Sequence, residues 1–132
     1  MSEDYVYGTA KDLKVGRYVI IDNIPCKVVS IDVSKPGKHG SAKMRITAIG
    51  LFGGEKKVLL TPSDADVKIP IIKKRTAQVL SFEGEYAQVM DKDTYETFDV
   101  YVPEEFRDKV EEGKEIEVLE AMGQRALIRV FK

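Results

Sequence analysis

The stretch that decides the fold is residues 26–52, CKVVSIDVSKPGKHGSAKMRITAIGLF. Both ends of this stretch are rich in β-branched residues and lack a helical period, so we predict two strands, Cys26–Val33 and Ala42–Phe52. In the second strand apolar residues alternate with Lys43, Arg45 and Thr47, which places two cations on one exposed face. In the first strand the same alternation assigns Cys26, Val28, Ser30 and Asp32 to one face and Val29, Ile31 and Val33 to the other.

Short strands continue on both sides of this hairpin. We predict Tyr18–Ile21, Lys57–Leu60 and Asp66–Ile69, with turns at residues 22–25 and at Gly53-Gly54. Five short strands within about 65 residues favour a small SH3-like barrel, which we assign to residues 1–70.

The segment from Pro70 to Arg75 is the expected boundary, and a second pattern follows it. Three strands, one helix and two strands form the order of a five-stranded OB-fold barrel, which we assign to residues 71–132. Pro103 at the start, acids in the first turn and Gly113 at the stop predict that helix over residues 103–110. The chain is therefore predicted to be all-β. The predicted strands of this half are Thr76–Phe82, Tyr86–Met90, Tyr95–Tyr101, Glu115–Glu120 and Arg125–Phe131.

Charge is divided unevenly between the two halves. The whole chain has a net charge of −1, but residues 1–70 carry 11 Lys and Arg against 8 Asp and Glu, and residues 71–132 carry 10 against 14. The excess of positive charge is concentrated between Val33 and Lys57. This asymmetry predicts two units with different surfaces, of which the first could meet a polyanion.

Composition excludes several classes of protein. The longest apolar run is four residues, far short of the roughly 20 needed to cross a bilayer. The acidic start Met1–Asp4 is unlike a secretory leader. One cysteine, Cys26, and one histidine, His39, build neither a disulfide framework nor a Cys/His zinc site. We therefore expect a cytoplasmic protein without a metal or an organic cofactor, and we interpret Cys26 as a small core residue.

The most informative segment is Ser34–Lys43, between the two strands of the opening stretch. Gly37 and Gly40 flank Lys38 and His39 and permit left-handed backbone, and Pro36 stiffens the entry. The pattern predicts a tight, protruding tip with one lysine at its apex. It does not fit a phosphate-binding loop, which needs a strand before it and a helix after it, and an exposed lysine lacks the pocket of a Schiff-base enzyme. We expect no catalytic residues.

This loop resembles the signature of the translation factor 5A family, the hypusine-containing proteins of eukaryotes and archaea. The resemblance covers essentially the whole two-barrel layout, and the compact length and Pro36 are similar to the archaeal branch. It implies that Lys38 is the modified lysine, extended by deoxyhypusine synthase with an aminobutyl group from spermidine to give deoxyhypusine or hypusine. The loop that would support modification and contact tRNA comprises Lys35, Pro36, Gly37, His39, Gly40, Ser41 and Lys43.

The resemblance also implies the activity and the partners. Members of the family bind the ribosome beside the acceptor end of peptidyl-tRNA, relieve stalling at proline runs and assist termination. A second cation at the end of a longer arm would position a slow substrate along a phosphate backbone. We expect further phosphate contacts from Arg45, Lys56 and Lys57. No membrane partner is expected, and a monomer is favoured.

Two other classes of function stay open from the residues alone. A generic RNA-binding or ribosome-associated module would use Lys38 as one phosphate contact among several, and a structural paralogue would lack the modification altogether. Four aromatic residues of the second half offer a base-stacking face of the kind found on some OB folds, but we interpret them as ordinary aromatic residues of strands. These residues are Tyr86, Tyr95, Phe98 and Tyr101.

Overall fold

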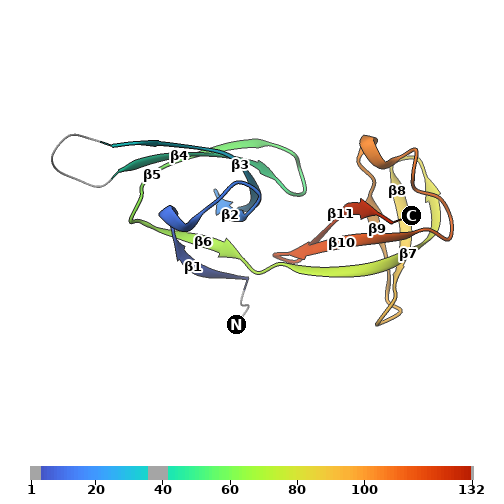
Figure 1. The fold of residues 1–132 in the computed structure, drawn as a ribbon. Helices are drawn as coiled ribbons and strands as arrows, with labels where there is room; N and C mark the ends of the chain where they lie inside the picture. The colour runs from blue at the N-terminus through green and yellow to red at the C-terminus, as the bar shows by residue number, and fades with distance from the viewer. Residues whose placement is uncertain (1–3, 36–41, 132) are drawn as a thin grey trace. The chain divides into compact units, whose positions relative to one another are not determined.

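A computed structural model of the chain describes residues 4–35 and 42–131 (Figure 1). The fold is all-β, an SH3-like barrel followed by a five-stranded OB-fold barrel with one short helical turn. The chain separates into two compact units, Met1–Ile71 and Ile72–Lys132.

The first unit is one antiparallel sheet of six strands in the order β1-β6-β2-β3-β4-β5. The sequence predicted only five of these, because β1 pairs with β6, about 60 residues away, and nothing local marks it. A short 3₁₀ helix, η1, follows β1 at Ala10–Asp12. The strands are β1 (Tyr5–Thr9), β2 (Tyr18–Ile21), β3 (Ile24–Ser34), β4 (Lys43–Gly50), β5 (Lys56–Pro62) and β6 (Asp66–Pro70).

The core of the first unit is formed by apolar side chains at alternate strand positions. Met44, Ile46 and Ala48 of β4 are buried, as the alternation predicted, and Ile46 is fully enclosed. Cys26 is also fully buried and its thiol donates a hydrogen bond to the Ile24 carbonyl oxygen at 3.2 Å. Burial raises the pKa of this thiol, so Cys26 behaves as the core residue that the sequence indicated.

A β-bulge at Val29 changes the face assignment that we made for β3. Val28 pairs with Ala48 but Ser30 pairs with Thr47, so Val29 is an extra residue with no partner in the register. Beyond the bulge the alternation is reversed: Ile31 packs against the core, whereas Ser30 is exposed. The prediction that Ser30 and Asp32 share a face with Cys26 and Val28 is wrong for this reason, because one inserted residue turns every later side chain over.

Two hairpin connections of this unit use left-handed backbone. Asp22 and Asn23 have φ of 53° and 64° and join β2 to β3 as a two-residue hairpin loop, while Ile24 and Pro25, predicted as part of the turn, already belong to β3. Between β4 and β5, Gly54 has φ of 72° and its N–H donates to the Gly50 carbonyl oxygen at 3.0 Å. Gly53-Gly54 thus lies in the connection that the sequence predicted.

The second unit is an antiparallel sheet of five strands in the order β11-β10-β7-β8-β9, and the outer strands β11 and β9 contact each other. Such a contact is what closure of an OB barrel requires. The strands are β7 (Lys73–Glu83), β8 (Tyr86–Asp91), β9 (Thr97–Tyr101), β10 (Glu115–Ala121) and β11 (Gln124–Val130).

The helix predicted over residues 103–110 is wrong in its extent. Only Glu104–Phe106 is helical, as a single 3₁₀ turn, η2. Eight residues are too few to repay the cost of nucleating an α-helix without strong packing along its length. The Val110 N–H nevertheless reaches the Phe106 carbonyl oxygen at 3.1 Å, and both side chains pack on the core of this unit. Phe106 thus anchors this segment in the core of the second unit.

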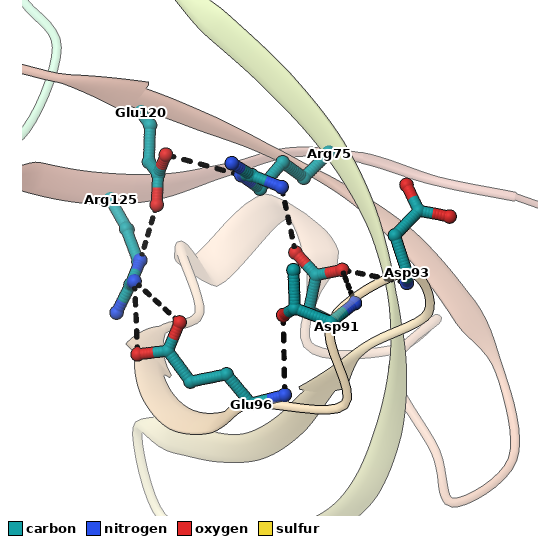
Figure 2. Close-up of polar contacts among 7 residues, drawn as sticks. Arg75, Asp91, Asp93, Glu96, Glu120 and Arg125 are labelled. Atoms are coloured by element: carbon teal, nitrogen blue, oxygen red, sulfur yellow. Dashed lines mark hydrogen bonds and ion pairs between the residues drawn. The ribbon is translucent and has the colours of Figure 1, made fainter.

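A network of ion pairs crosses the second unit (Figure 2). The Arg75 guanidinium of β7 forms ion pairs with the carboxylates of Glu120 of β10, at 3.2 Å, and Asp91 of β8, at 3.4 Å. Arg125 of β11 bonds the other oxygen of Glu120 at 2.8 Å and also pairs with Glu96 at 3.2 Å. Four strands and the β8–β9 turn are therefore joined by two guanidinium groups and three carboxylates.

Asp91 is the buried member of this network, with only 2% of its surface exposed. One carboxylate oxygen accepts from the backbone N–H groups of Asp93, at 2.7 Å, and Thr94, at 3.0 Å. The bond from Thr94, together with that from Asp93 and the charge of Arg75, lowers the pKa of Asp91 against the effect of burial. This carboxylate organises the turn in which Tyr95 takes φ of 64°, and β9 consequently begins at Thr97 rather than at Tyr95.

Candidate nucleic-acid interface

The loop that the sequence singled out lies between β3 and β4, where the described chain stops at Lys35 and resumes at Ala42. Six of the predicted site residues therefore lie outside the described residues, and the structure does not test the roles expected for them. They are Pro36, Gly37, Lys38, His39, Gly40 and Ser41.

The two ends of the loop are held in register by three strands. Ser34 of β3 pairs with Lys43 of β4, and Lys43 pairs in turn with Pro62 of β5. One residue closer to the loop, the Ala42 carbonyl oxygen accepts a hydrogen bond from the Ser63 N–H at 2.8 Å. The ladder thus continues to Ala42, the first described residue after the loop, and the strands fix where the loop begins and ends.

Two of the predicted cations next to the loop, Lys43 and Arg45, share the outward face of this hairpin. Lys43 and Arg45 are exposed, and the alternating residues Met44 and Ile46 are buried. Lys35 is exposed at the end of β3. Arg45 lies directly opposite Asp32 on β3. Asp32 is the one carboxylate among the four residue pairs that run from Ile31–Ile46 to Ser34–Lys43. Three exposed cations at one end of a hairpin suit a polyanion such as a nucleic-acid backbone.

The other two predicted phosphate contacts, Lys56 and Lys57, lie elsewhere. They belong to the beginning of β5, where Lys56 pairs with Ile49, six residues along β4 from Lys43. At the rise of an antiparallel strand this separation is about 20 Å. Lys57 is also engaged, because its ammonium group lies 3.4 Å from the Asp22 carboxylate. The structure therefore does not bring Lys56 and Lys57 together with Lys35, Lys43 and Arg45.

A groove that sequence reasoning missed runs beside the cations. It has a volume of about 610 Å³ and is lined by residues of β3, β4 and β5, among them Lys43 and Arg45. Its apolar wall includes Leu60, which is 71% exposed, and Val33, which is 56% exposed. Sequence reasoning missed it because Leu60 lies within the apolar run Val58–Leu60; only the structure shows that Leu59 packs on the core and that Leu60 points outward. The site consequently offers apolar contact area as well as positive charge.

The four aromatic residues proposed as strand aromatics do not form one surface. Phe98 is partly buried against the core of the second unit, under the Arg125 guanidinium, whose central carbon lies 4.2 Å from the ring centroid. Tyr95 is exposed in the β8–β9 turn. Tyr86 and Tyr101 are neighbours on β8 and β9. The structure thus excludes a continuous stacking face of all four.

Other kinds of site find little support in residues 4–35 and 42–131. Within these residues no group of three His, Cys, Asp or Glu side chains is placed to hold a metal ion. None of the helices in the same part of the chain is long and apolar enough to cross a membrane.

Comparison with known proteins gives the same family for both halves of the chain. The family model described as translation initiation factor 5A-like, N-terminal, matches residues 6–65. The model described as eukaryotic elongation factor 5A hypusine, DNA-binding OB fold, matches residues 71–130.

Archaeal relatives match over almost the whole length. A translation initiation factor 5A of Archaeoglobus fulgidus is 48% identical over 91% of this chain and 94% of its own. One of Methanothermobacter thermautotrophicus is 51% identical over 90% and 92%. The solved structure of the Methanococcus jannaschii factor superimposes with a TM-score of 0.91 at 44% identity, covering 99% of this chain and 98% of its own. Since models of one family match both halves, and relatives that are 48% and 51% identical cover 91% and 90% of its length, this chain belongs to the translation initiation factor 5A family.

Proposed function

We propose that this protein binds the ribosome beside peptidyl-tRNA, promotes peptide-bond formation at stalled sequences such as proline runs, and assists termination. The modified side chain would be Lys38, carrying deoxyhypusine or hypusine. The observation that carries the proposal is that, in a member of this family, the two ends of the loop belong to a ladder of three strands. The outward face of this ladder bears exposed Lys43 and Arg45. Under this proposal the protein acts in the cytoplasm and is itself the substrate of a deoxyhypusine synthase.

This proposal gives different roles to the phosphate contacts and to the aminobutyl arm. Lys35, Lys43 and Arg45 bind phosphates of ribosomal RNA or tRNA, and this contribution depends on salt rather than on sequence. The aminobutyl arm on Lys38 keeps the lysine charge, adds a second and extends the reach by roughly 6 Å. The arm enters a crevice that is too narrow for a barrel and orders the acceptor end of the tRNA. Ordering a slow substrate lowers the entropic part of the barrier without proton transfer by the protein.

The first experiment is mass spectrometry of the protein purified from its native cells, on the peptide that spans Lys35 to Lys43. The proposal expects one aminobutyl unit on Lys38, with or without an added oxygen atom. An unmodified Lys38 in active native protein would refute the arm mechanism and leave a generic RNA-binding module.

The second experiment separates the arm from the phosphate contacts in a translation assay with a proline-run reporter. Lys38→Arg keeps a cation but removes the modification site, so it should abolish the stimulation at the proline run while ribosome binding is largely kept. Lys43→Gln and Arg45→Gln should weaken ribosome binding and reduce its salt dependence by about one unit of slope each. Lys56→Gln, about 20 Å from Lys43 and about 14 Å from Arg45 along the sheet, is the matched control and should change neither quantity.

A further inference from the structure

Two tyrosines on the second unit form an exposed aromatic pair. Tyr86 of β8 is paired in register with Tyr101 of β9, and their ring centroids lie 5.8 Å apart at an interplanar angle of 72°. Tyr86 is 57% exposed and Tyr101 is 43% exposed. Neither ring belongs to the core, which takes the alternate residues Ala87 and Val100. The pair therefore presents aromatic surface to solvent on the outward face of the sheet.

Tyr101 is held in one orientation by Arg107, which follows η2. The Arg107 Nη2 donates to the Tyr101 hydroxyl at 3.1 Å, and its Nε donates to the Val102 carbonyl oxygen at 3.0 Å. The guanidinium carbon also lies 5.7 Å from the centroid of the Tyr101 ring. A ring that is already fixed loses little side-chain entropy when a ligand binds, so Tyr101 is preorganised.

The surroundings of the pair are anionic. Glu83 of β7 lies in register beside Tyr86, and Asp99 of β9 lies one outward position along from Tyr101, opposite Gln88. Both carboxylates are exposed. Residues 78–83, 86–90 and 97–101, which make up this part of the sheet, contain no Lys or Arg. We call the outward surface of Glu83, Tyr86, Asp99 and Tyr101 the tyrosine face.

Arg107 does not reverse the sign of the tyrosine face. Besides the two acceptors above, its guanidinium lies 3.9 Å from the Glu85 carboxylate. Its charge is thus already shared between a carboxylate and an aromatic ring, whereas Glu83 and Asp99 face solvent. Glu83, Glu85 and Asp99 together outnumber the single cation Arg107, so the charge around the two rings is negative in sum.

From this arrangement we infer that the tyrosine face is a docking site for an arginine- or lysine-bearing segment of a partner protein. A cation over a tyrosine ring is attracted by the negative face of the ring, and a carboxylate beside the ring neutralises the charge that is brought in. The same carboxylates repel phosphates, so a nucleic acid is disfavoured although bases stack well on tyrosines. This role is independent of Lys38 and of the cations of the first unit.

The test is an amide chemical-shift titration of the full-length, isotope-labelled protein. The probes are a twelve-residue peptide of alternating Arg and Gly, an uncharged peptide of alternating Ser and Gly, and a ten-nucleotide single-stranded RNA homopolymer. With the arginine peptide, shifts should be centred on the amides of β8 and β9 around Tyr86 and Tyr101 and should weaken with added salt. The uncharged peptide should leave these amides unmoved, and the RNA should shift the β3–β4 hairpin instead.

Variants distinguish attraction to the ring from simple apolar contact. Tyr86→Leu keeps a large apolar side chain without the aromatic face, and it should weaken binding of the arginine peptide by about twofold to fivefold. Tyr86→Phe keeps the ring and should bind as the parent does. Asp99→Asn should weaken binding, whereas Asp93→Asn, in the turn at the other end of β8, should have no effect.

Tyr95→Leu is the matched aromatic control, since Tyr95 is 70% exposed but lies in the β8–β9 turn, away from the tyrosine face. Its binding of the peptide should equal that of the parent. Three results would overturn the inference: shifts of the tyrosine face by RNA at lower concentration than by the peptide, equal shifts by the uncharged peptide, or no response of β8 and β9 to the arginine peptide.

Discussion

Replacing Asp91 by Asn tests the account of the ion-pair network most directly. The asparagine side chain has almost the same shape, and its carbonyl oxygen can still accept from the N–H groups of Asp93 and Thr94, at 2.7 and 3.0 Å in the parent. It cannot accept from Arg75, whose Nη1 lies 3.4 Å from the second carboxylate oxygen. The change therefore removes one charge and one charged bond from a side chain that is only 2% exposed, and leaves the packing intact.

The expected loss follows from the strengths of the bonds involved. Two bonds to a carboxylate become bonds to a neutral amide, each weaker by about 0.5–1 kcal/mol, and the long bond from Arg75 is lost outright. We expect Asp91→Asn to lower the free energy of unfolding of the second unit by about 2 kcal/mol at pH 7. Asp91→Ala, which leaves the two N–H groups and the guanidinium without this acceptor, should cost about 3–4 kcal/mol.

The pH dependence gives the sharper signature. The pKa of Asp91 is lowered in the folded state, so the unfolded chain binds more protons near pH 4, and stability rises with pH there. The contribution of Asp91 is complete above the ordinary aspartate pKa of about 3.9 and is lost as the pH falls through the lower folded value. The difference between parent and Asp91→Asn should accordingly be greatest above about pH 5 and shrink in more acidic solution.

The assay is urea unfolding followed by the intensities of resolved amide signals of the second unit, such as those of Val89 and Leu127, between pH 2 and pH 7. Signals of the first unit, such as that of Ile46, provide the internal control. A constant difference between parent and variant across this range would refute the reasoning, because it would mean that the charge of Asp91 contributes nothing and that only its shape matters.

Three further substitutions test other parts of the structure. Arg125→Lys should lower the free energy of unfolding of the second unit by about 1 kcal/mol in urea, because one ammonium group cannot pair with Glu120 and Glu96 as the guanidinium does. A variant as stable as the parent would contradict this. Ile46→Ala should lower the stability of the first unit by about 2–5 kcal/mol, because Ile46 is fully enclosed and a cavity remains; a loss below 1 kcal/mol in the same assay would show a site that collapses freely. Gly54→Ala should cost about 1 kcal/mol through its φ of 72° alone, as an added Cβ meets no atom within 4 Å, and thermal unfolding should show the loss.

The parts of the fold that could be predicted are those written in local patterns. The strict alternation of Met44 and Ile46 with Lys43 and Arg45 determined which face of β4 is buried, and the structure has the same faces. The glycines at 53–54 correctly marked the connection to β5. Local signals suffice in such cases because the period of a strand and the backbone demands of a turn are set within a few residues.

What could not be predicted depends on distant partners. β1 exists because Val6 and its neighbours find β6, and no feature of the first ten residues announces that pairing. The bulge at Val29 is visible only once β4 is laid beside β3. In the network, Arg75 reaches Asp91 and Glu120 across 16 and 45 positions of sequence, so the sequence showed three ordinary charged residues where the fold makes one cluster.

The site shows the same division. The exposed face of Lys43 and Arg45 on β4 was predicted from sequence, since an alternation is local, whereas the roles predicted for residues 36–41 lie outside the described residues and stay predictions. The separation of Lys56 and Lys57 from those cations was not, because their place depends on how β5 is registered against β4. The exposure of Leu60 was missed because it lies within an apolar run, Val58–Leu60, in which only the fold decides which side chain turns outward.

The register of Ser34, Lys43 and Pro62 joins the loop-bearing end of the first unit to three paired strands (Figure 1). These strands are β3, β4 and β5, and they are anchored where Ile46 and Val28 pack in the core. A force applied at Ser34 and Lys43, the strand residues on either side of the loop, would be transmitted to these core residues through the paired backbone bonds. A transplant of residues 34–43 alone into a foreign scaffold would omit Val28 and Ile46, which anchor the strands in the core. The smallest portable element is therefore the three strands together with their buried side chains.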